Sequence, residues 1–308
     1  MRDTILFGDC RDTLKQFDEK ARMCVTSPPY YGLRDYGGKD DQIGQEQSPE
    51  EFVQQLVEVF SLVRDNLTDD GTLWLNIGDS YYNYRSDGNY PKQTVSRTKQ
   101  DLPDFSPVRG NKLEGYKSKD LIGIPWMLAF ALRADGWYLR QDIIWHKPNP
   151  MPESVKDRCT KAHEYIFLLS KSKHYHYDNE AIKEPAKDWG TRDRTNGKYH
   201  NEGTGLQPHS GLTKSYEKRN KRSVWSVNKK PYKGAHFATY PSELIEPCIR
   251  AGSEKGDIIL DPFMGSGTTA CVAKELGRDY IGCELNQEYG KLIKERLGLL
   301  CGEFGNMH

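Results

Sequence analysis

Residues 257–284 read DIILDPFMGSGTTACVAKELGRDYIGCE, and this stretch decides the fold. Asp257 to Leu260 predicts a short strand, and a glycine-rich turn follows it at once. Thr268 to Leu276 predicts a helix, and Tyr280 to Cys283 predicts a second strand that ends at Glu284. A strand, a helix and a strand in this order form a βαβ unit. Such a unit requires a parallel sheet whose faces are covered by helices.

The same alternation of strands and helices extends through the rest of the chain. The clearest helix start is Ser48-Pro49-Glu50-Glu51, with a serine cap, a proline at the first helical position and acidic residues in the first turn. The pair Asp70-Gly71 predicts the end of that helical unit. Further strands are expected at 4–7, 22–26, 72–77, 137–145 and 164–170, and further helices at 11–17, 121–133, 241–251 and 287–297. The pattern predicts an α/β fold with a doubly wound, mostly parallel sheet.

Charge is distributed unevenly along this chain of 308 residues, whose formal net charge is zero. The segment 171–233 holds 15 Lys and Arg against 7 Asp and Glu, and the segment 85–119 holds 8 against 4. Both lie in polar stretches without a sustained period, and long loops of this kind are usually functional or disordered. Two basic segments in a neutral chain indicate contact with a polyanion. Two solvated loops are the alternative.

Aromatic residues are interleaved with the charges of these two segments. They are Tyr81, Tyr82, Tyr84, Tyr90, Trp189, Tyr199, Tyr216 and Trp225. Each of them alone fits ordinary surface packing. As a set beside the excess positive charge they favour a nucleic acid, because bases stack on aromatic rings.

Seven cysteines stand at irregular positions, and none forms a CxxC pair. This pattern suggests neither a zinc site nor a disulfide framework, and it favours buried thiols in a reducing cytoplasm. No metal is expected. No apolar run approaches the roughly 20 residues that span a bilayer, and the first residues lack a signal-peptide pattern. We therefore expect a cytoplasmic protein without membrane contact.

The glycine-rich turn has the features of an anion- and nucleoside-binding loop. Glycines let the backbone approach a ligand, and the following helix offers free N–H groups at its N-terminus. Glu284 lies 19 residues after Gly265, about where an acidic side chain would hold a ribose hydroxyl pair. No lysine follows the last glycine, which argues against a nucleoside triphosphate. A tight turn without a ligand is the alternative.

The pattern D-P-F-x-G-x-G-T at 261–268 resembles the AdoMet-binding motif of the amino-group DNA methyltransferases. The resemblance implies that S-adenosyl-L-methionine (AdoMet) is the methyl donor, with Asp261 near its methionine amino group and Phe263 covering one side. It also implies a place near the adenine for Asp9 and a place in the methionine pocket for Phe237. The implied cofactor-binding residues are Asp9, Phe237, Asp261, Pro262, Phe263, Gly265, Gly267, Thr268 and Glu284.

A second motif, Ser27-Pro28-Pro29-Tyr30, follows the expected strand 22–26. An exocyclic base amine is a poor nucleophile, because its lone pair is delocalised into the ring. Acceptors that hold its N–H groups free that lone pair, while the prolines make the loop rigid and the aromatic ring offers a stacking face. The motif resembles motif IV, [S/D/N]-P-P-[Y/F/W], of the N4-cytosine and N6-adenine methyltransferases. The resemblance implies that Ser27 and the carbonyl of Pro28 hold the amine, that Pro29 stiffens the loop and that Tyr30 stacks on a flipped base.

The order of the motifs resembles the β group of these enzymes, because the catalytic loop precedes the AdoMet loop and a basic insert lies between them. It implies a circularly permuted catalytic and AdoMet-binding domain at 1–170 and 235–308, with a basic loop at about 81–119 and a target-recognition insert at 171–234. WHKPNP at 145–150 resembles a segment that contacts the target-base pocket. Double-stranded DNA is the implied partner. A cognate restriction endonuclease and a homodimer are left open.

One residue bears on the choice of target base. Ser27 is typical of N4-cytosine enzymes, whereas Asp or Asn there is typical of N6-adenine enzymes, so cytosine N4 is favoured and adenine N6 is the alternative. Asp35 is a nearby carboxylate that fits either the site or a plain turn. RNA and protein N-methyltransferases of related fold usually carry N-P-P-Y after the AdoMet loop, whereas here the motif comes before it. A cytosine-C5 enzyme needs a Pro-Cys nucleophile, and the nearest match, Pro247-Cys248, lies in an expected helix. An RNA or protein substrate and an inactive DNA-binding homologue remain as alternatives.

Overall fold

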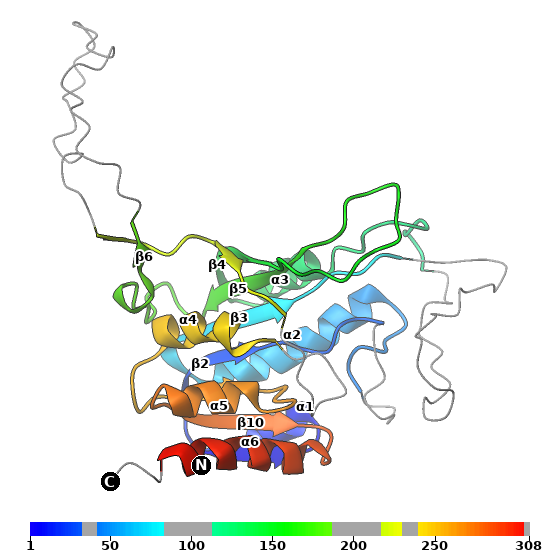
Figure 1. Cartoon of the computed structure of the whole chain (residues 1–308). Helices are drawn as coiled ribbons and strands as arrows, with labels where there is room; N and C mark the ends of the chain where they lie inside the picture. Colours follow the sequence, from blue (N-terminus) through cyan, green and yellow to red (C-terminus); the bar gives the residue numbers. More distant parts are fainter. Residues whose placement is uncertain (33–41, 83–112, 187–216, 230–239, 305–308) are drawn as a thin grey trace, which may run out of the picture.

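An eight-stranded sheet runs through the part of the chain that the computed structural model describes, residues 1–32, 42–82, 113–186, 217–229 and 240–304 (Figure 1). In chain order its strands are β1 (Thr4–Phe7), β2 (Ala21–Thr26), β3 (Leu67–Ile77), β4 (Tyr138–His146), β5 (His163–Ser170), β8 (Val224–Ser226), β9 (Ile258–Asp261) and β10 (Asp279–Glu284). Two short strands, β6 (Glu184–Pro185) and β7 (Lys218–Arg219), form a separate antiparallel pair.

The strands lie in the order β1-β10-β9-β2-β3-β5-β4-β8. Neighbours from β1 to β3 run parallel, β5 runs antiparallel to both β3 and β4, and β8 is parallel to β4. The predicted α/β fold with a mostly parallel sheet is therefore confirmed. Because β5 is reversed, its first residues lie at the same edge as the last residues of β2, β3, β4 and β9. We call this edge the carboxyl edge of the sheet.

Helices cover both faces of the sheet, as a doubly wound fold requires. On one face, α2 (Pro49–Asn66) and α3 (Ile124–Ala134) pack together with α1 (Cys10–Thr13) and the 3-10 helix η1 (Leu14–Gln16). On the other face lie α4 (Ser242–Gly252), α5 (Thr268–Glu275), α6 (Tyr289–Phe304) and the 3-10 helix η3 (Glu180–Ile182). The expected helices are present, with ends that differ by a few residues.

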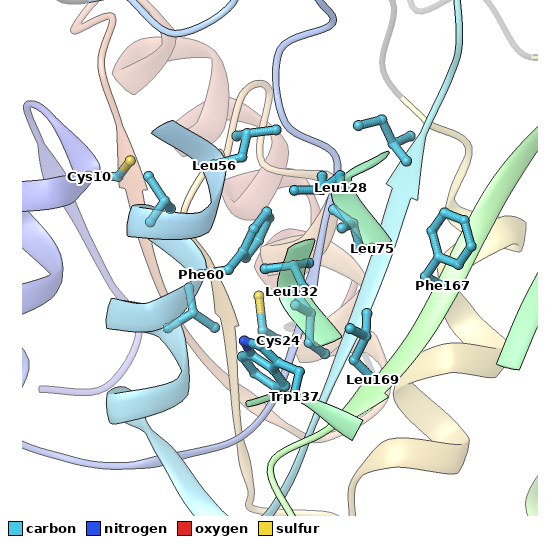
Figure 2. Close-up of a cluster of buried hydrophobic side chains, with 14 of the residues drawn as sticks. Cys10, Cys24, Leu56, Phe60, Leu75, Leu128, Leu132, Trp137, Phe167 and Leu169 are labelled. Carbon is cyan, nitrogen blue, oxygen red and sulfur yellow. The ribbon is translucent and has the colours of Figure 1, made fainter. Parts of the chain in front are cut away.

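The alternation of side chains along the strands divides the core into two clusters. In β2, Cys24 faces the α2 side whereas Met23 and Val25 face the α4 side, because successive side chains of a strand point to opposite faces. Figure 2 shows the first cluster, to which Phe60 of α2 and Leu132 of α3 contribute. Complete burial of a side chain such as Phe60 stabilises the fold by roughly 1.5–3 kcal/mol.

The junction between α2 and β3 differs from the prediction. The helix ends at Asn66 and β3 begins at once with Leu67, so Asp70-Gly71 lies inside the strand and does not end the helical unit. The pairing of β3 with β2 is irregular at this point. Gly71 suits that irregularity, because a Cβ there would lie 2.8 Å from the Cβ of Leu67. The Asp-Gly signal therefore marks a bulge in a strand.

The expected target-recognition insert is described only in part, since 187–216 and 230–239 lie outside the described residues, as do most of the basic loop (83–112) and Asp35. Strand β8 comes from this insert and joins the main sheet, where Trp225 is buried. Tyr82 is buried as well, so these two rings pack inside the protein and are not exposed to a nucleic acid. Of the other interleaved aromatics, Tyr81 is partly exposed, and the rest, Tyr84, Tyr90, Trp189, Tyr199 and Tyr216, lie outside the described residues. Within those residues no helix is long and apolar enough to cross a membrane.

Candidate active site at the carboxyl edge of the sheet

The two motifs leave the sheet from neighbouring strands. β2 pairs in parallel with β9, with Cys24 opposite Leu260. The Ser27-Pro28-Pro29-Tyr30 loop follows β2, and the glycine-rich loop follows β9. The carboxyl ends of parallel strands are where open α/β sheets bind their ligands. Segments more than 230 residues apart in sequence are thus brought together.

Asp261, the last residue of β9, ties these loops together. Its side chain is fully buried (0% exposed). One oxygen, Oδ1, accepts hydrogen bonds from Thr26 Oγ1 at 2.6 Å and from the backbone N of Phe263 at 3.0 Å. The other, Oδ2, accepts from the hydroxyls of Thr269 at 2.5 Å and Tyr240 at 3.0 Å. We call Asp261, Thr26, Thr269 and Tyr240 the Asp261 cluster.

The Asp261 cluster changes how the expected role of Asp261 is understood. Burial raises the pKa of this carboxyl group, and the four hydrogen bonds oppose that effect. Protein donors reach both oxygens, so the side chain joins the two loops by hydrogen bonds. The sequence had suggested contact with a methionine amino group, and no signal in it pointed to Thr26 or Tyr240 as partners.

The glycine-rich loop needs its glycines for different reasons. Gly267 (φ +80°) begins α5 in the left-handed region, and a Cβ there would lie 3.1 Å from Ile293 Cγ2. Gly265 (φ +53°) is also left-handed but is open, with the nearest atom 3.9 Å from a Cβ. Pro262 and Thr268 are buried, whereas Phe263 stays partly exposed. The accessible rim of the loop is therefore made by Phe263 and Gly265.

Two acidic residues flank the glycine-rich loop, as expected. Glu284 ends β10 and is mostly buried, with Oε2 accepting from the backbone N of Gly265 at 2.7 Å and Oε1 from that of Asn286 at 2.9 Å. Burial raises the pKa of its carboxyl group. Asp9 follows β1, where the backbone N of Gly8 donates to the carbonyl of Glu284 at 2.9 Å, and it pairs with Arg11. Phe237 lies outside the described residues.

The Ser-Pro-Pro-Tyr loop presents one free group and one anchored group. Ser27 is partly exposed, and no hydrogen bond joins its hydroxyl to the described part of the chain. Pro28 is buried and Pro29 is partly buried. Tyr30 is partly exposed, and its hydroxyl donates to Glu164 Oε2 at 2.8 Å. The Ser27 hydroxyl is therefore available to a ligand, while the Tyr30 ring is anchored by the hydrogen bond from its hydroxyl to Glu164.

Sequence reasoning missed the residues behind Tyr30. Glu164 stands near the start of β5 and forms an ion pair with Lys147, which follows β4. Burial lowers the pKa of Lys147, although Glu164 opposes that effect, and its ammonium lies 4.3 Å from the centroid of the Trp145 ring. Lys147 belonged to the quoted WHKPNP segment. Glu164 was expected to be the first residue of an apolar strand, and the residues around it show no motif that indicates a site.

A cleft of about 1050 Å³ opens next to the Ser-Pro-Pro-Tyr loop. Its lining includes Tyr31, Gly32, Asp79, Tyr81 and residues 153–158. Arg158 places its guanidinium 3.8 Å from the centroid of the Tyr81 ring. A cleft of this size is large enough for a nucleotide. Within the described residues, no group of three or more His, Cys, Asp or Glu side chains is arranged to hold a metal ion.

Comparison with known proteins agrees with this arrangement. A family model described as DNA methylase matches residues 21–295. The Type II methyltransferase M.SmaI of Serratia marcescens is 48% identical over 294 residues, which cover 95% of this chain and 90% of that protein.

Two solved structures share the fold. The PvuII DNA methyltransferase, named as cytosine-N4-specific, superimposes with a TM-score of 0.62 at 19% identity, covering 96% of this chain and 86% of that one. The M1.HpyAVI–SAM complex gives a TM-score of 0.54 at 19% identity, covering 95% and 98%. Together with the match to the DNA methylase family over most of its length, these findings show that the chain belongs to the β group of the DNA amino-methyltransferases.

Proposed function

We propose that this protein moves a methyl group from AdoMet to cytosine N4 of a base flipped out of double-stranded DNA. The observation that carries the proposal is the pair of loops on β2 and β9, joined by the hydrogen bond from Thr26 to Asp261. This bond couples the loop that resembles a base-amine site to the loop that resembles an AdoMet site. The family membership supports the reaction class, and the target base rests on Ser27.

The residues around the glycine-rich loop fit AdoMet. The left-handed Gly265 and Gly267 leave the backbone open to a ligand, Glu284 lies beside Gly265, and Asp9 lies next to Glu284 along the edge. Carboxylates at strand ends hold ribose hydroxyls in comparable α/β sites. We assign Glu284 to the ribose, Asp9 to the adenine side and Phe263 to one face of the cofactor. AdoMet supplies an electrophilic methyl group when it is bound.

The chain's own residues prepare the nucleophile. We assign the Ser27 hydroxyl and the Pro28 carbonyl as acceptors of the two amine N–H groups, so that the lone pair on nitrogen becomes available. The ring of Tyr30 stacks on the flipped base. No covalent intermediate with the protein is needed. The amine nitrogen would bond to the methyl carbon as the methyl–sulfur bond breaks, the sulfur would leave as a neutral thioether, and the amine would release one proton to water. Unstacking the base costs a few kcal/mol, which contacts to the DNA backbone must offset.

Ser27 is the basis for choosing cytosine over adenine. A hydroxyl polarises an amine less strongly than a carboxylate does, and serine at this position is typical of N4-cytosine enzymes. Adenine N6 is the alternative. The PvuII enzyme carries cytosine-N4 specificity in its name, but at 19% identity it supports the fold alone.

The remaining assignments concern organisation and partners. We propose that 1–170 and 235–308 form the catalytic domain and that the insert 171–234 reads the DNA sequence, apart from β8, which is part of the main sheet. We also propose a cytoplasmic protein. The family resemblance leaves open a cognate restriction endonuclease and a homodimer, which co-purification and ultracentrifugation would test.

The deciding experiment uses labelled AdoMet with DNA, RNA and protein acceptors in separate reactions. DNA that gains label is digested to nucleosides, and the methylated base is identified by mass spectrometry. We expect N4-methylcytosine in DNA alone. If N6-methyladenine is found instead, the target base is adenine. If label appears in RNA or protein alone, the proposal that DNA is the substrate is wrong. Failure to bind AdoMet in calorimetry would favour an inactive DNA-binding homologue.

A further inference from the structure

The ring of Tyr30 lies against two strands, β3 and β5, at the carboxyl edge. Its hydroxyl donates to Glu164 Oε2 at 2.8 Å, and that hydroxyl lies 3.5 Å from Asn76 Oδ1. A Cβ on Gly78 would lie 2.7 Å from Tyr30 Cε2 and 3.3 Å from Glu164 Cγ. The ring can occupy this place only because residue 78 has no side chain. Asn76 in turn donates from Nδ2 to the carbonyl of Tyr165 at 3.0 Å, which fixes its amide.

Glu164 uses its two oxygens for two different partners. Oε1 pairs with the ammonium of Lys147, and Oε2 accepts from Tyr30. The Lys147 side chain is 7% exposed and that of Glu164 is 16% exposed, so neither has much room to move. The backbone N of Lys147 donates to the carbonyl of Ala162 at 2.8 Å, which fixes the position from which the lysine reaches Glu164. A carboxylate held at Oε1 by a fixed ammonium presents Oε2 in one direction.

Stability alone gives a weak account of this ion pair. Removing two charges from water offsets most of their attraction, so a buried pair contributes little net stability compared with apolar side chains of similar size. Such a pair does hold its two side chains in a defined geometry. Here that geometry fixes Glu164 Oε2, which accepts from the hydroxyl of Tyr30, the ring that stacks on the target base under the proposed function.

We propose that Glu164 and Lys147 are positioning residues that fix the plane of the Tyr30 ring before DNA binds, with Gly78 providing the space for it. This inference rests on the proposed function, because it assumes that the target base stacks on Tyr30. The two residues act through Tyr30 and touch neither the base nor AdoMet. Their loss therefore lowers kcat, since a misplacement of about 1 Å at a reacting centre costs up to about 10²-fold in rate.

The test is a double-mutant cycle between Tyr30→Phe and Glu164→Gln. The acceptor is unmethylated genomic DNA, the donor is tritium-labelled AdoMet, and kcat, the KM for each substrate and Tm are measured. We expect Tyr30→Phe to lower kcat about tenfold, because it removes a hydrogen bond to a charged group, and Glu164→Gln to lower it about 10- to 100-fold. The KM for AdoMet stays within about twofold in both variants. In the Tyr30→Phe background, Glu164→Gln should lower kcat by less than about threefold further.

Two further variants separate positioning from general stability. Gly78→Ala pushes on the ring directly and should lower kcat without removing any charge. Asp135→Asn breaks the Arg64–Asp135 pair, whose side chains are 25% and 24% exposed and which lies at the opposite edge of the sheet. It should lower Tm without changing kcat. Losses of kcat that multiply fully in the double variant, or an equal loss in Asp135→Asn, overturn the inference.

Methyl transfer by the unmodified protein distinguishes failure of this inference from failure of the proposed function. If the unmodified protein methylates DNA and the cycle is fully multiplicative, only the positioning role is wrong. If the unmodified protein transfers no label to DNA, the proposed function itself is wrong, and the inference falls with it.

Discussion

Two regions of the carboxyl edge hold their side chains in different ways. On the side of the glycine-rich loop, which the proposed function assigns to AdoMet (the AdoMet side), the buried Asp261 carboxylate accepts only from neutral donors, three hydroxyls and one backbone N–H. On the side of Tyr30, which the proposed function assigns to the target base (the base side), Glu164 joins a lysine ammonium to the hydroxyl of Tyr30 in a mostly buried ion pair. The first region contains no positively charged partner, while the second is built on an ion pair.

The different partners of Asp261 and Glu164 indicate different roles for the two sides. The Asp261 cluster connects two loops that follow neighbouring parallel strands, and its four hydrogen bonds offset part of the cost of burying the Asp261 carboxyl group. Under the proposed function, the base side admits a bulky ligand beside Tyr30. A mostly buried ion pair there adds little net stability, because desolvation offsets most of its attraction, but it holds its two side chains in one geometry. We therefore expect changes on the AdoMet side to affect stability and changes on the base side to affect rate.

The largest effect is expected from Asp261→Ala. It removes the acceptor of the Thr26 hydroxyl, of the Phe263 backbone N–H and of one of the two hydroxyls of Thr269 and Tyr240, which lie close enough to bond to each other. Each group left unsatisfied costs about 1–3 kcal/mol before relaxation. We expect the free energy of unfolding to fall by about 3 kcal/mol or more, and methyl transfer to become undetectable. Urea unfolding and labelled-AdoMet transfer measure the two effects.

Asp279→Asn is the matched control for that change, because Asp279 begins the neighbouring strand β10 at the opposite edge. Its ion pairs with Arg2 and Lys274 are partly exposed, with the two cationic side chains 50% and 39% exposed, and surface pairs contribute about 0–1 kcal/mol. If Asp261→Ala unfolds no more easily than Asp279→Asn, the bracing role of Asp261 is refuted.

The next effect, Ser27→Ala, should separate rate from stability. The Ser27 hydroxyl has no hydrogen bond to the described part of the chain, so its loss should change the free energy of unfolding by less than about 0.5 kcal/mol. Loss of one acceptor for the amine should lower kcat about 10²-fold, the size of effect seen when one group that stabilises a transition state is removed. AdoMet affinity in calorimetry should stay unchanged. Unaltered kcat would remove Ser27 from the site, and Ser242→Ala, on the exposed start of α4, is the control.

The same comparison explains what the sequence could predict. The AdoMet side rests on local patterns, because a strand, a glycine-rich turn and a helix follow one another within 257–276, and an acidic residue follows at 284. The two motifs could be paired because neighbouring parallel strands present their loops at one edge. Most of the fold follows from similar periodicity, although the Asp70-Gly71 signal was misassigned because a bulge and a turn use the same residues.

The Ser-Pro-Pro-Tyr motif itself could be read from the sequence, but the partners of Tyr30 could not, because these contacts have no local pattern. Tyr30 and Glu164 are 134 residues apart, and they meet only because β5 runs antiparallel between β3 and β4. Strand direction is a property of the assembled sheet, and a glutamate that begins an apolar run gives no sign of its partner. The hydroxyl of Tyr240 was missed for a similar reason, since its acceptor lies on another element.

A smaller effect is expected from the two glycines of the AdoMet loop. Gly267→Ala combines a left-handed backbone, which costs a residue with a Cβ roughly 1–2 kcal/mol, with a Cβ 3.1 Å from Ile293. Gly265→Ala has the backbone cost without the crowding. We expect Gly267→Ala to lower the free energy of unfolding by about 1 kcal/mol more than Gly265→Ala, and both to weaken AdoMet binding in calorimetry. Equal stability of the two variants would show that α6 yields to the added methyl group.

The smallest effect should come from single hydroxyls of the Asp261 cluster. Tyr240→Phe and Thr26→Val each remove one donor to Asp261 and should each lower the free energy of unfolding by about 1 kcal/mol, the net value of one hydrogen bond. They should differ in kinetics, because Thr26 directly precedes the Ser-Pro-Pro-Tyr loop whereas the Tyr240 hydroxyl lies beside that of Thr269 in α5, the helix that follows the glycine-rich loop. We expect Thr26→Val to lower kcat and Tyr240→Phe to raise the KM for AdoMet, each by about fivefold. If both variants change the same kinetic constant, the Asp261 cluster acts on both loops together. Thr26 then belongs with the AdoMet side, and the proposed difference between the two sides does not apply to it.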